Sequence, residues 1–151
     1  MLRAQFSDAL KEAMKSKDQR SVSTLRLILA ALKDRDIAAR TKGNRDGIDD
    51  GEVLSLLQTM IKQRHESISL YEQGGRLELA EQEREEIGII ERFLPKQMSE
   101  AETRAAISAL IAELGASSIK DMGRTMAELR SRYAGQMDFT KASGLVRETL
   151  V

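Results

Sequence analysis

The chain has one histidine and no cysteine, which narrows the chemistry that its side chains can perform. Without cysteine, disulfides, thiolate metal ligands and thiolate nucleophiles are excluded. His65 lies in Arg64-His65-Glu66-Ser67, on a segment with helical spacing, and a zinc motif with two histidines is impossible. Nothing in the sequence supports a Ser-His-Asp triad. We expect His65 to be a solvated or packing residue, and we predict no catalytic residue, no metal site and no cofactor.

Two short motifs resemble parts of known sites but fit helix ends better. Gly74-Gly75 lacks the GxxxxGK[ST] pattern and the preceding strand of a phosphate loop, so it indicates a helix break. Ser117 and Ser118 with Lys120 resemble the Ser-Ser-Lys set of amidases in composition alone. Because these serines follow a helix end, we expect one of them to cap the next helix.

Four closely spaced glutamates are candidates for acid–base chemistry: Glu81, Glu83, Glu85 and Glu86. They are too consecutive to converge on one face of a helix. We therefore expect them to form a solvated face.

The net charge is zero, yet the charges are unevenly distributed. Ten basic and four acidic residues lie between Lys11 and Arg45, whereas six acidic and two basic residues lie between Arg76 and Glu91. After Gly115 there are six basic and four acidic residues. Two interpretations remain: opposite blocks that face each other within a helical fold, or a basic stripe that binds an anionic partner.

The predicted location of the protein rests on the absence of two sequence features, a membrane span and a secretory signal. No apolar run approaches the roughly 20 residues of a membrane span. Residues 1–8 contain no apolar region of a secretory signal. We therefore expect a cytoplasmic protein that does not contact a membrane.

Apolar residues recur with helical spacing along almost the whole chain, and no stretch alternates as a strand does. Helix starts are indicated by capping residues, and helix ends by glycines. The starts are Asp18, Asp49, Ser99 and Asp138, and the ends are Gly74, Gly115 and Gly135. The predicted fold is all-α, with an N-terminal bundle of about four helices followed by a small C-terminal domain of three helices.

Pro95, the single proline, divides the chain. Proline disfavours helix in the residue before it, so a helix should end near Leu94. Ser99 and Glu102 have the spacing of a capping box and should start the next helix. We predict an N-terminal bundle at residues 1–94 and a C-terminal domain at residues 95–151.

A series of short motifs around this proline resembles one known family in order and spacing. The motifs are Leu10-Lys11-Glu12-Ala13-Met14-Lys15 with Leu25-Arg26; Lys62-Gln63-Arg64 with Glu66-Ser67-Ile68 and Tyr71; Arg76-Leu77 with Leu79-Ala80; Glu83 with Glu86-Ile87; Leu94-Pro95-Lys96-Gln97-Met98-Ser99; and Gly115-Ala116-Ser117-Ser118 with Asp121-Met122-Gly123-Arg124 and Met126. From Leu2 to Leu150 the chain resembles the free-standing, YqeY-like members of the GatB/YqeY family.

The resemblance implies a helical N-terminal part and a C-terminal part similar to the tail of the amidotransferase B subunit. In that tRNA-dependent enzyme, which makes Gln-tRNA or Asn-tRNA, the tail contacts tRNA. The family is associated with carbon–nitrogen ligase activity with glutamine as amido-N-donor. Because this chain has no recognisable ATP, metal or glutaminase site, we do not expect it to perform that reaction alone.

Three hypotheses follow, the first being a tRNA- or RNA-binding accessory protein. Its candidate binding residues are Lys120, Arg124, Arg130, Arg132, Lys141 and Arg147. Gln136-Met137-Asp138-Phe139 departs from the family pattern by losing a basic residue and a backbone-relaxing residue, which weakens the case for tRNA contact at this turn. The second hypothesis is a helical protein-interaction module, which docks on a translation-related complex through the basic block and the loop Arg40–Gly47. The third is an amidotransferase in its own right. We expect a monomer.

Overall fold

The computed structural model describes residues 1–150, which form seven α-helices and one short 3-10 helix and contain no strand. The predicted all-α class is confirmed. By contacts within the chain, it divides into two compact units, Met1–Leu94 and Pro95–Val151.

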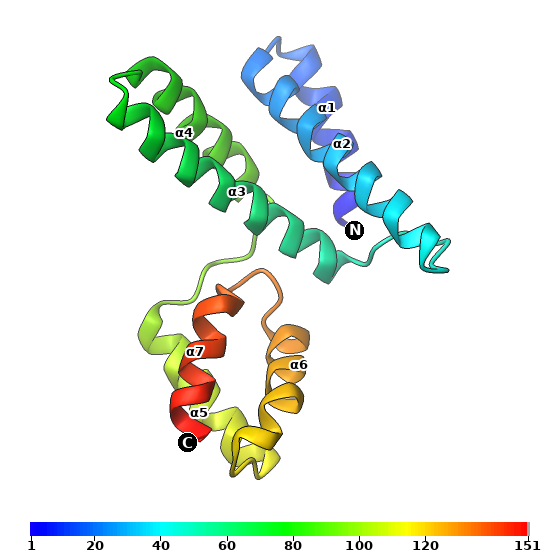
Figure 1. The fold of residues 1–151 in the computed structure, drawn as a ribbon. Coiled ribbons are helices and arrows are strands. Elements are labelled where there is room, and N and C mark those ends of the chain that lie inside the picture. The colour runs from blue at the N-terminus through cyan, green and yellow to red at the C-terminus, as the bar shows by residue number, and fades with distance from the viewer. Residues whose placement is uncertain (151) are drawn as a thin grey trace. The chain divides into compact units, whose positions relative to one another are not determined.

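The N-terminal unit consists of two antiparallel helical hairpins (Figure 1). The first pairs α1 (Leu2–Lys15) with α2 (Gln19–Thr41), and the second pairs α3 (Asp50–Gln73) with α4 (Leu77–Glu91). Helix α2 contacts both helices of the second hairpin, so it joins the two hairpins into one unit.

Helix starts in this unit follow the predicted caps. The side chain of Asp18 accepts a hydrogen bond from the backbone N–H of Ser21 at 3.2 Å. Asp49 accepts one from the N–H of Glu52 at 2.8 Å. Each bond satisfies a backbone donor that the first helical turn leaves without a partner.

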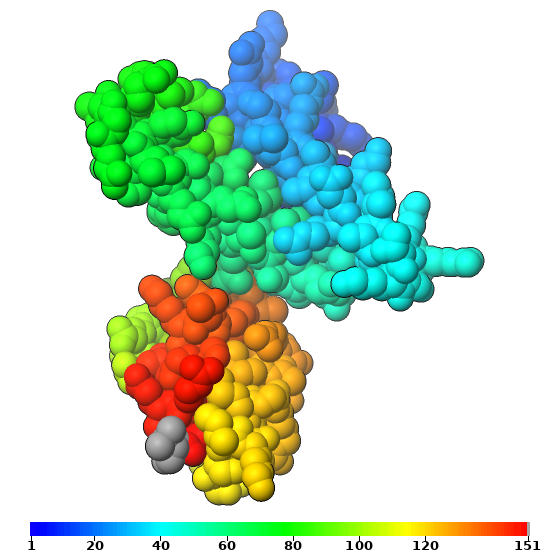
Figure 2. Space-filling view, viewed as in Figure 1, coloured from blue at the N-terminus to red at the C-terminus, as the bar shows by residue number. Residues whose placement is uncertain are grey.

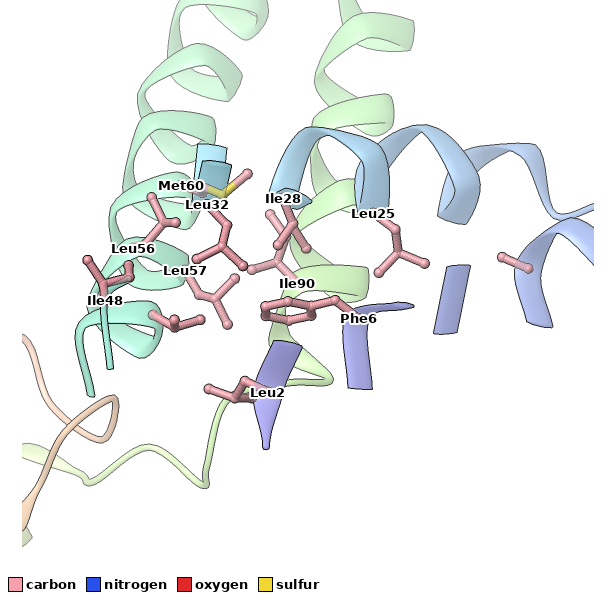
Figure 3. Packing of buried hydrophobic residues seen from close by; sticks show 12 residues of the cluster. Leu2, Phe6, Leu25, Ile28, Leu32, Ile48, Leu56, Leu57, Met60 and Ile90 are labelled. Atoms are coloured by element: carbon pink, nitrogen blue, oxygen red, sulfur yellow. The ribbon is translucent and has the colours of Figure 1, made fainter. Parts of the chain in front are cut away.

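The apolar core of this unit gathers side chains from all four helices. Phe6 is 0% exposed and lies among Leu25, Ile28 and Ile90 (Figure 3). Its ring meets the ring of Phe93 edge to face, with centroids 4.9 Å apart. A separate small cluster at the other end of the second hairpin consists of Ile68, Ala80 and Ile87.

An ion pair fastens the first hairpin to the loop that precedes α3. Arg3 donates two hydrogen bonds to the carboxylate of Asp36, at 2.6 and 2.8 Å, and one to the carbonyl of Ile48 at 2.8 Å. The backbone N–H of Ile48 donates to the same carboxylate at 3.0 Å. The guanidinium of Arg3 holds the pKa of Asp36 down, at about 2.

Thr24 offers a test of this core. Its hydroxyl is fully buried on α2 and has no hydrogen-bond partner among residues 1–150. Thr24→Val keeps the shape and removes an unsatisfied polar atom, so the free energy of unfolding should rise by about 1 kcal/mol in chemical denaturation. Thr125 is the matched control: it is equally buried, but its hydroxyl donates to the carbonyl of Asp121 at 2.9 Å. Thr125→Val should lower stability, and a stabilising Thr125→Val would contradict the argument.

The C-terminal unit comprises α5 (Glu100–Leu114), the 3-10 helix η1 (Ile119–Asp121), α6 (Met122–Arg132) and α7 (Phe139–Leu150). Its own apolar core is built on residues from each α-helix and on Met137 from the turn before α7: Ile107, Leu110, Met126, Leu129, Met137, Ala142, Val146 and Leu150. The predicted capping box is confirmed. The N–H of Ser99 donates to Glu102 at 3.0 Å, and the N–H of Glu102 donates to the Ser99 hydroxyl at 3.1 Å.

Two details around Pro95 differ from expectation or add to it. Helix α4 ends at Glu91 rather than near Leu94, because the N–H groups of residues 92–94 bond three residues back instead of four and tighten the chain into a turn. Within the C-terminal unit, the N–H of Met98 donates to the carbonyl of Gln136 at 2.8 Å. The turn that departs from the family pattern therefore anchors the start of its own unit.

Candidate nucleic-acid interface

The six predicted binding residues do not form one patch. Lys120 lies on η1, three arginines lie on α6, and Lys141 and Arg147 lie on α7. Helices α6 and α7 are in contact and run antiparallel (Figure 1). Lys120, Arg124 and Arg147 therefore lie at one end of this helix pair, the η1 end. Arg130, Arg132 and Lys141 lie at the opposite end, which we call the 133–138 end.

At the 133–138 end, Arg132 is occupied by acidic partners. It donates two hydrogen bonds to Glu113, at 2.6 and 2.9 Å, and one to Glu128 at 2.8 Å. These bonds raise the pKa of Arg132 and lower the pKa of Glu113. Arg132 thus ties α6 to α5, and little of its charge is left for a ligand.

The other two cations at this end form no ion pair within residues 1–150, but each lies beside groups that compete with a polyanion. The Arg130 guanidinium lies over the Phe139 ring, 5.9 Å from its centroid. Lys141 lines a groove that three acidic residues share: Glu100, Asp138 and Glu148. The 133–138 end is therefore a poor site for a polyanion.

At the η1 end the cations are freer. Lys120 and Arg147 are exposed and make no ion pair within residues 1–150. Arg124 contacts Asp121 at 3.2 Å in an exposed pair, an interaction worth about 0–1 kcal/mol. Asp121 has a structural role, because its carboxylate accepts from the N–H groups of Ser117 at 2.9 Å and Ser118 at 3.4 Å. These bonds, the Ser117 bond foremost, lower the pKa of Asp121.

Aromatic side chains contribute little open surface in this unit. Tyr133 and Phe139 are partly buried and pack against the core. The ring of Phe139 is also covered by the guanidinium of Arg130. An RNA ligand would therefore be held through its phosphates rather than by base stacking.

Sequence reasoning missed one charged cluster in the N-terminal unit. Arg64 on α3 is mostly buried, donates to Glu86 at 3.0 Å and to the carbonyl of Met60 at 3.1 Å, and approaches Glu83 within 3.8 Å. Burial, with the neighbouring Glu86 charge, raises the pKa of Glu83. The expectation that all four glutamates form a solvated face is thus wrong for these two, and their spacing of three was the available signal.

The rest of the acidic block only partly neutralises the basic block. Glu85 accepts from Arg20 at 3.0 Å and so links α4 to α2. Arg20 is the one residue among the ten basic residues from Lys11 to Arg45 with an ion pair to a residue in 1–150. One pair therefore joins the two blocks, most of the other basic side chains face solvent, and the binding of an anionic partner stays a prediction.

Residues 1–150 contain neither a group of metal ligands nor a membrane-spanning helix. Within residues 1–150, no three His, Cys, Asp or Glu side chains are grouped so that they could hold a metal ion. In the same range, no helix has the length and apolar character needed to cross a bilayer.

The fold thus defines an all-α protein with two compact helical units and exposed basic side chains. The sequence identifies the protein family, because the pattern of the YqeY-like protein family matches residues 3–150. The chain belongs to this family.

Relatives from fungi support the same assignment. "Altered inheritance of mitochondria protein 41, mitochondrial" of Lachancea thermotolerans is 34% identical over 74% of this chain and 58% of its own length. "Uncharacterized protein C22F3.15" of Schizosaccharomyces pombe is 32% identical over 65% of this chain and 76% of its own length. The chain thus spans less than two thirds of the first of these relatives.

The cytoplasmic location expected from the sequence is contradicted by these relatives. The proteins of Lachancea thermotolerans, Candida glabrata and Eremothecium gossypii carry "mitochondrial" in their names. The expectation failed because it considered only a secretory apolar segment. Mitochondrial targeting uses amphipathic, arginine-rich segments instead, which that criterion does not detect.

Proposed function

We propose that this YqeY-like protein is a non-catalytic accessory protein that binds tRNA, or another RNA, through the η1 end of its C-terminal unit. The observation that supports the proposal is the exposure of Lys120, Arg124 and Arg147 at that end, two of them without an ion pair in residues 1–150. Long cationic side chains of this kind contact phosphates and position a protein on RNA without reading its sequence.

The similarity of this unit to an amidotransferase tail connects the proposal to tRNA-dependent amide transfer. We propose that the protein assists such a carbon–nitrogen ligase and does not itself use glutamine as amido donor. With glutamine, ATP and mischarged tRNA, the pure chain should form no amidated tRNA. Product formation by the chain alone would instead make it an enzyme.

Two matched double variants test the binding surface. Lys120→Glu/Arg147→Glu reverses two charges at the η1 end, and Arg130→Glu/Lys141→Glu reverses the same two residue types at the 133–138 end. With unfractionated tRNA at about 50 mM salt, the first variant should bind about tenfold more weakly or worse. The slope of log K against log salt should also become shallower by about 1.5, because each lost phosphate contact reduces the slope by about 0.7–0.9.

The control variant should retain affinity within about threefold of the wild type, because Arg130 lies over the Phe139 ring and Lys141 shares its groove with Glu100, Asp138 and Glu148, which repel a polyanion. Equal losses in the two variants would show that net charge, rather than the η1 end, determines binding. Absence of tRNA binding by the wild-type chain at low salt would refute the proposal.

A further inference from the structure

We infer that the α1–α2 hairpin is a docking site for an acidic amphipathic helix of a partner protein. This inference concerns the N-terminal unit and a protein ligand, so it goes beyond the RNA binding proposed for the C-terminal unit. It rests on the shape of the hairpin surface, on its exposed apolar side chains and on a row of unpaired cations.

The hairpin surface carries two grooves that follow the same helix. The first, of about 760 Å³, lies along the N-terminal half of α2 and includes Met14, Val22 and Leu27. The second, of about 350 Å³, lies along the C-terminal half of α2 and includes Leu29 and Ile37. Side chains of the C-terminal half of α2 and the following loop project into solvent (cyan in Figure 2). Together the grooves offer an elongated surface suited to an elongated ligand.

Large apolar side chains are exposed in both grooves. Met14 is 53% exposed, and Leu27 and Ile37 are each 48% exposed. An isolated exposed apolar residue is ordinary, but apolar residues gathered in a groove and rimmed by charges are typical of an interaction site. A ligand that covers them must itself present apolar side chains.

The charges beside these residues follow a helical register. Arg26, Lys33 and Arg40 are seven residues apart along α2, so they lie on one face at intervals of roughly 10 Å. None of them forms an ion pair within residues 1–150. A second helix repeats its own side chains every seven residues with the same rise. Glutamates at heptad spacing, beside an apolar stripe, would therefore match the cations and the apolar residues together.

A nucleic acid fits this surface less well. Phosphates could neutralise Arg26, Lys33 and Arg40, but they would leave Met14, Leu27 and Ile37 in water. No aromatic residue lines either groove, so bases would find no stacking surface there. The combination of apolar and basic residues favours a protein helix.

Binding of a designed peptide to the full chain tests the inference. The probe is a fluorescein-labelled helix of about three heptads, with leucines along one stripe and glutamates beside it. A second peptide has the same composition but a permuted order without an apolar stripe. By fluorescence anisotropy, the amphipathic peptide should bind at least about tenfold more tightly than the permuted one. If it does not, the inference is overturned.

Three variants of the chain locate the site. Arg26→Glu/Lys33→Glu/Arg40→Glu and the uncharged change Met14→Gln/Leu27→Gln should each weaken binding at least about tenfold. Arg35→Glu/Lys62→Glu/Lys96→Glu makes the same charge change outside the grooves and should keep affinity within about threefold. Circular dichroism checks the folding of each variant, and the Gln pair decides the question if the triple reversal fails to fold.

Two other results would assign the surface to a different occupant and overturn the inference. One is tRNA binding that the Arg26/Lys33/Arg40 reversal removes and that the amphipathic peptide does not compete for. The other is self-association of the wild-type chain in sedimentation velocity that the same reversal abolishes. The η1-end variants should bind the peptide as the wild type does, so failure of the RNA proposal and failure of this inference remain distinguishable.

Discussion

Replacing Phe6 with alanine is expected to lower the free energy of unfolding of the N-terminal unit by about 3–5 kcal/mol. Phe6 is 0% exposed and sits where α1 meets α2, α4 and the turn after α4. The change removes a large apolar side chain, leaves a cavity, and abolishes the edge-to-face contact with Phe93. Because the chain has two units, amide hydrogen exchange measured by the mass of peptides should report the stability of each unit separately.

The conservative change Phe6→Leu separates packing from the aromatic contact. It keeps an apolar side chain in place and should cost less than about 1.5 kcal/mol. Exchange in peptides from residues 99–150 should stay as in the wild type for both variants. A cost of less than about 1 kcal/mol for Phe6→Ala would mean that α1 does not form part of this core.

Replacing Gly47 with alanine should destabilise the same unit by about 3 kcal/mol. Gly47 has a φ of +87°, and an added Cβ would lie 2.6 Å from Oδ1 of Asp36 and 2.9 Å from Nη2 of Arg3. The change therefore strains the backbone and separates the ion pair that fastens the first hairpin to the loop. Urea denaturation with exchange readout on residues 1–94 measures the loss.

Gly43→Ala is the matched control for the backbone term. Gly43 has a φ of +92°, but a Cβ there would meet nothing within 4 Å. The free energy of unfolding of this variant should fall only by the cost of placing an alanine in the left-handed region, about 1–2 kcal/mol. Equal losses at both glycines would show that the Arg3–Asp36 pair contributes nothing to the effect.

The loss of stability at acidic pH should also differ between Gly47→Ala and Gly43→Ala. The pKa of Asp36 is about 2 in the folded chain against 3.8 as its ordinary value. Below pH 3.8 the unfolded state therefore binds more protons, and the stability from this group is lost as the pH falls toward 2. Gly43→Ala should retain this loss in full, whereas Gly47→Ala should show a shallower one because its pair is already broken. The raised pKa of Glu83 has the opposite effect on stability, since it favours the folded state as the pH falls. Both glycine variants keep Glu83, so this effect is the same in each and does not alter their comparison.

Local signals in the sequence predicted much of the helical framework. Asp18, Asp49 and Ser99 cap helices as expected, and Gly115 ends α5 with a φ of +65°. These predictions succeed because a cap or a left-handed glycine depends on residues within a few positions of it. The end of α4 was placed three residues too late, since the tightened turn before Pro95 carries no residue signal of its own.

Contacts between helices could not be predicted in the same way. The partner of Arg132 is Glu113, 19 residues earlier, and the partner of Arg64 is Glu86, 22 residues later. Counting charges identified a basic C-terminal segment, but it could not show that Arg132 is engaged while Lys120 and Arg147 are not. That distinction depends on which helix faces cross in space, which periodicity alone does not specify.

The main apolar cores of the two units have no residue in common. One takes its members from Leu2 to Leu94, and the other takes them from Met98 to Leu150. Each stretch of chain therefore carries the apolar residues that its own folding requires. Genetic recombination at the single junction between Leu94 and Pro95 can attach the second unit to another gene product without dividing either core. A segment with this property is portable in evolution, which gives a physical reason why a module like it can recur at the end of an otherwise different protein.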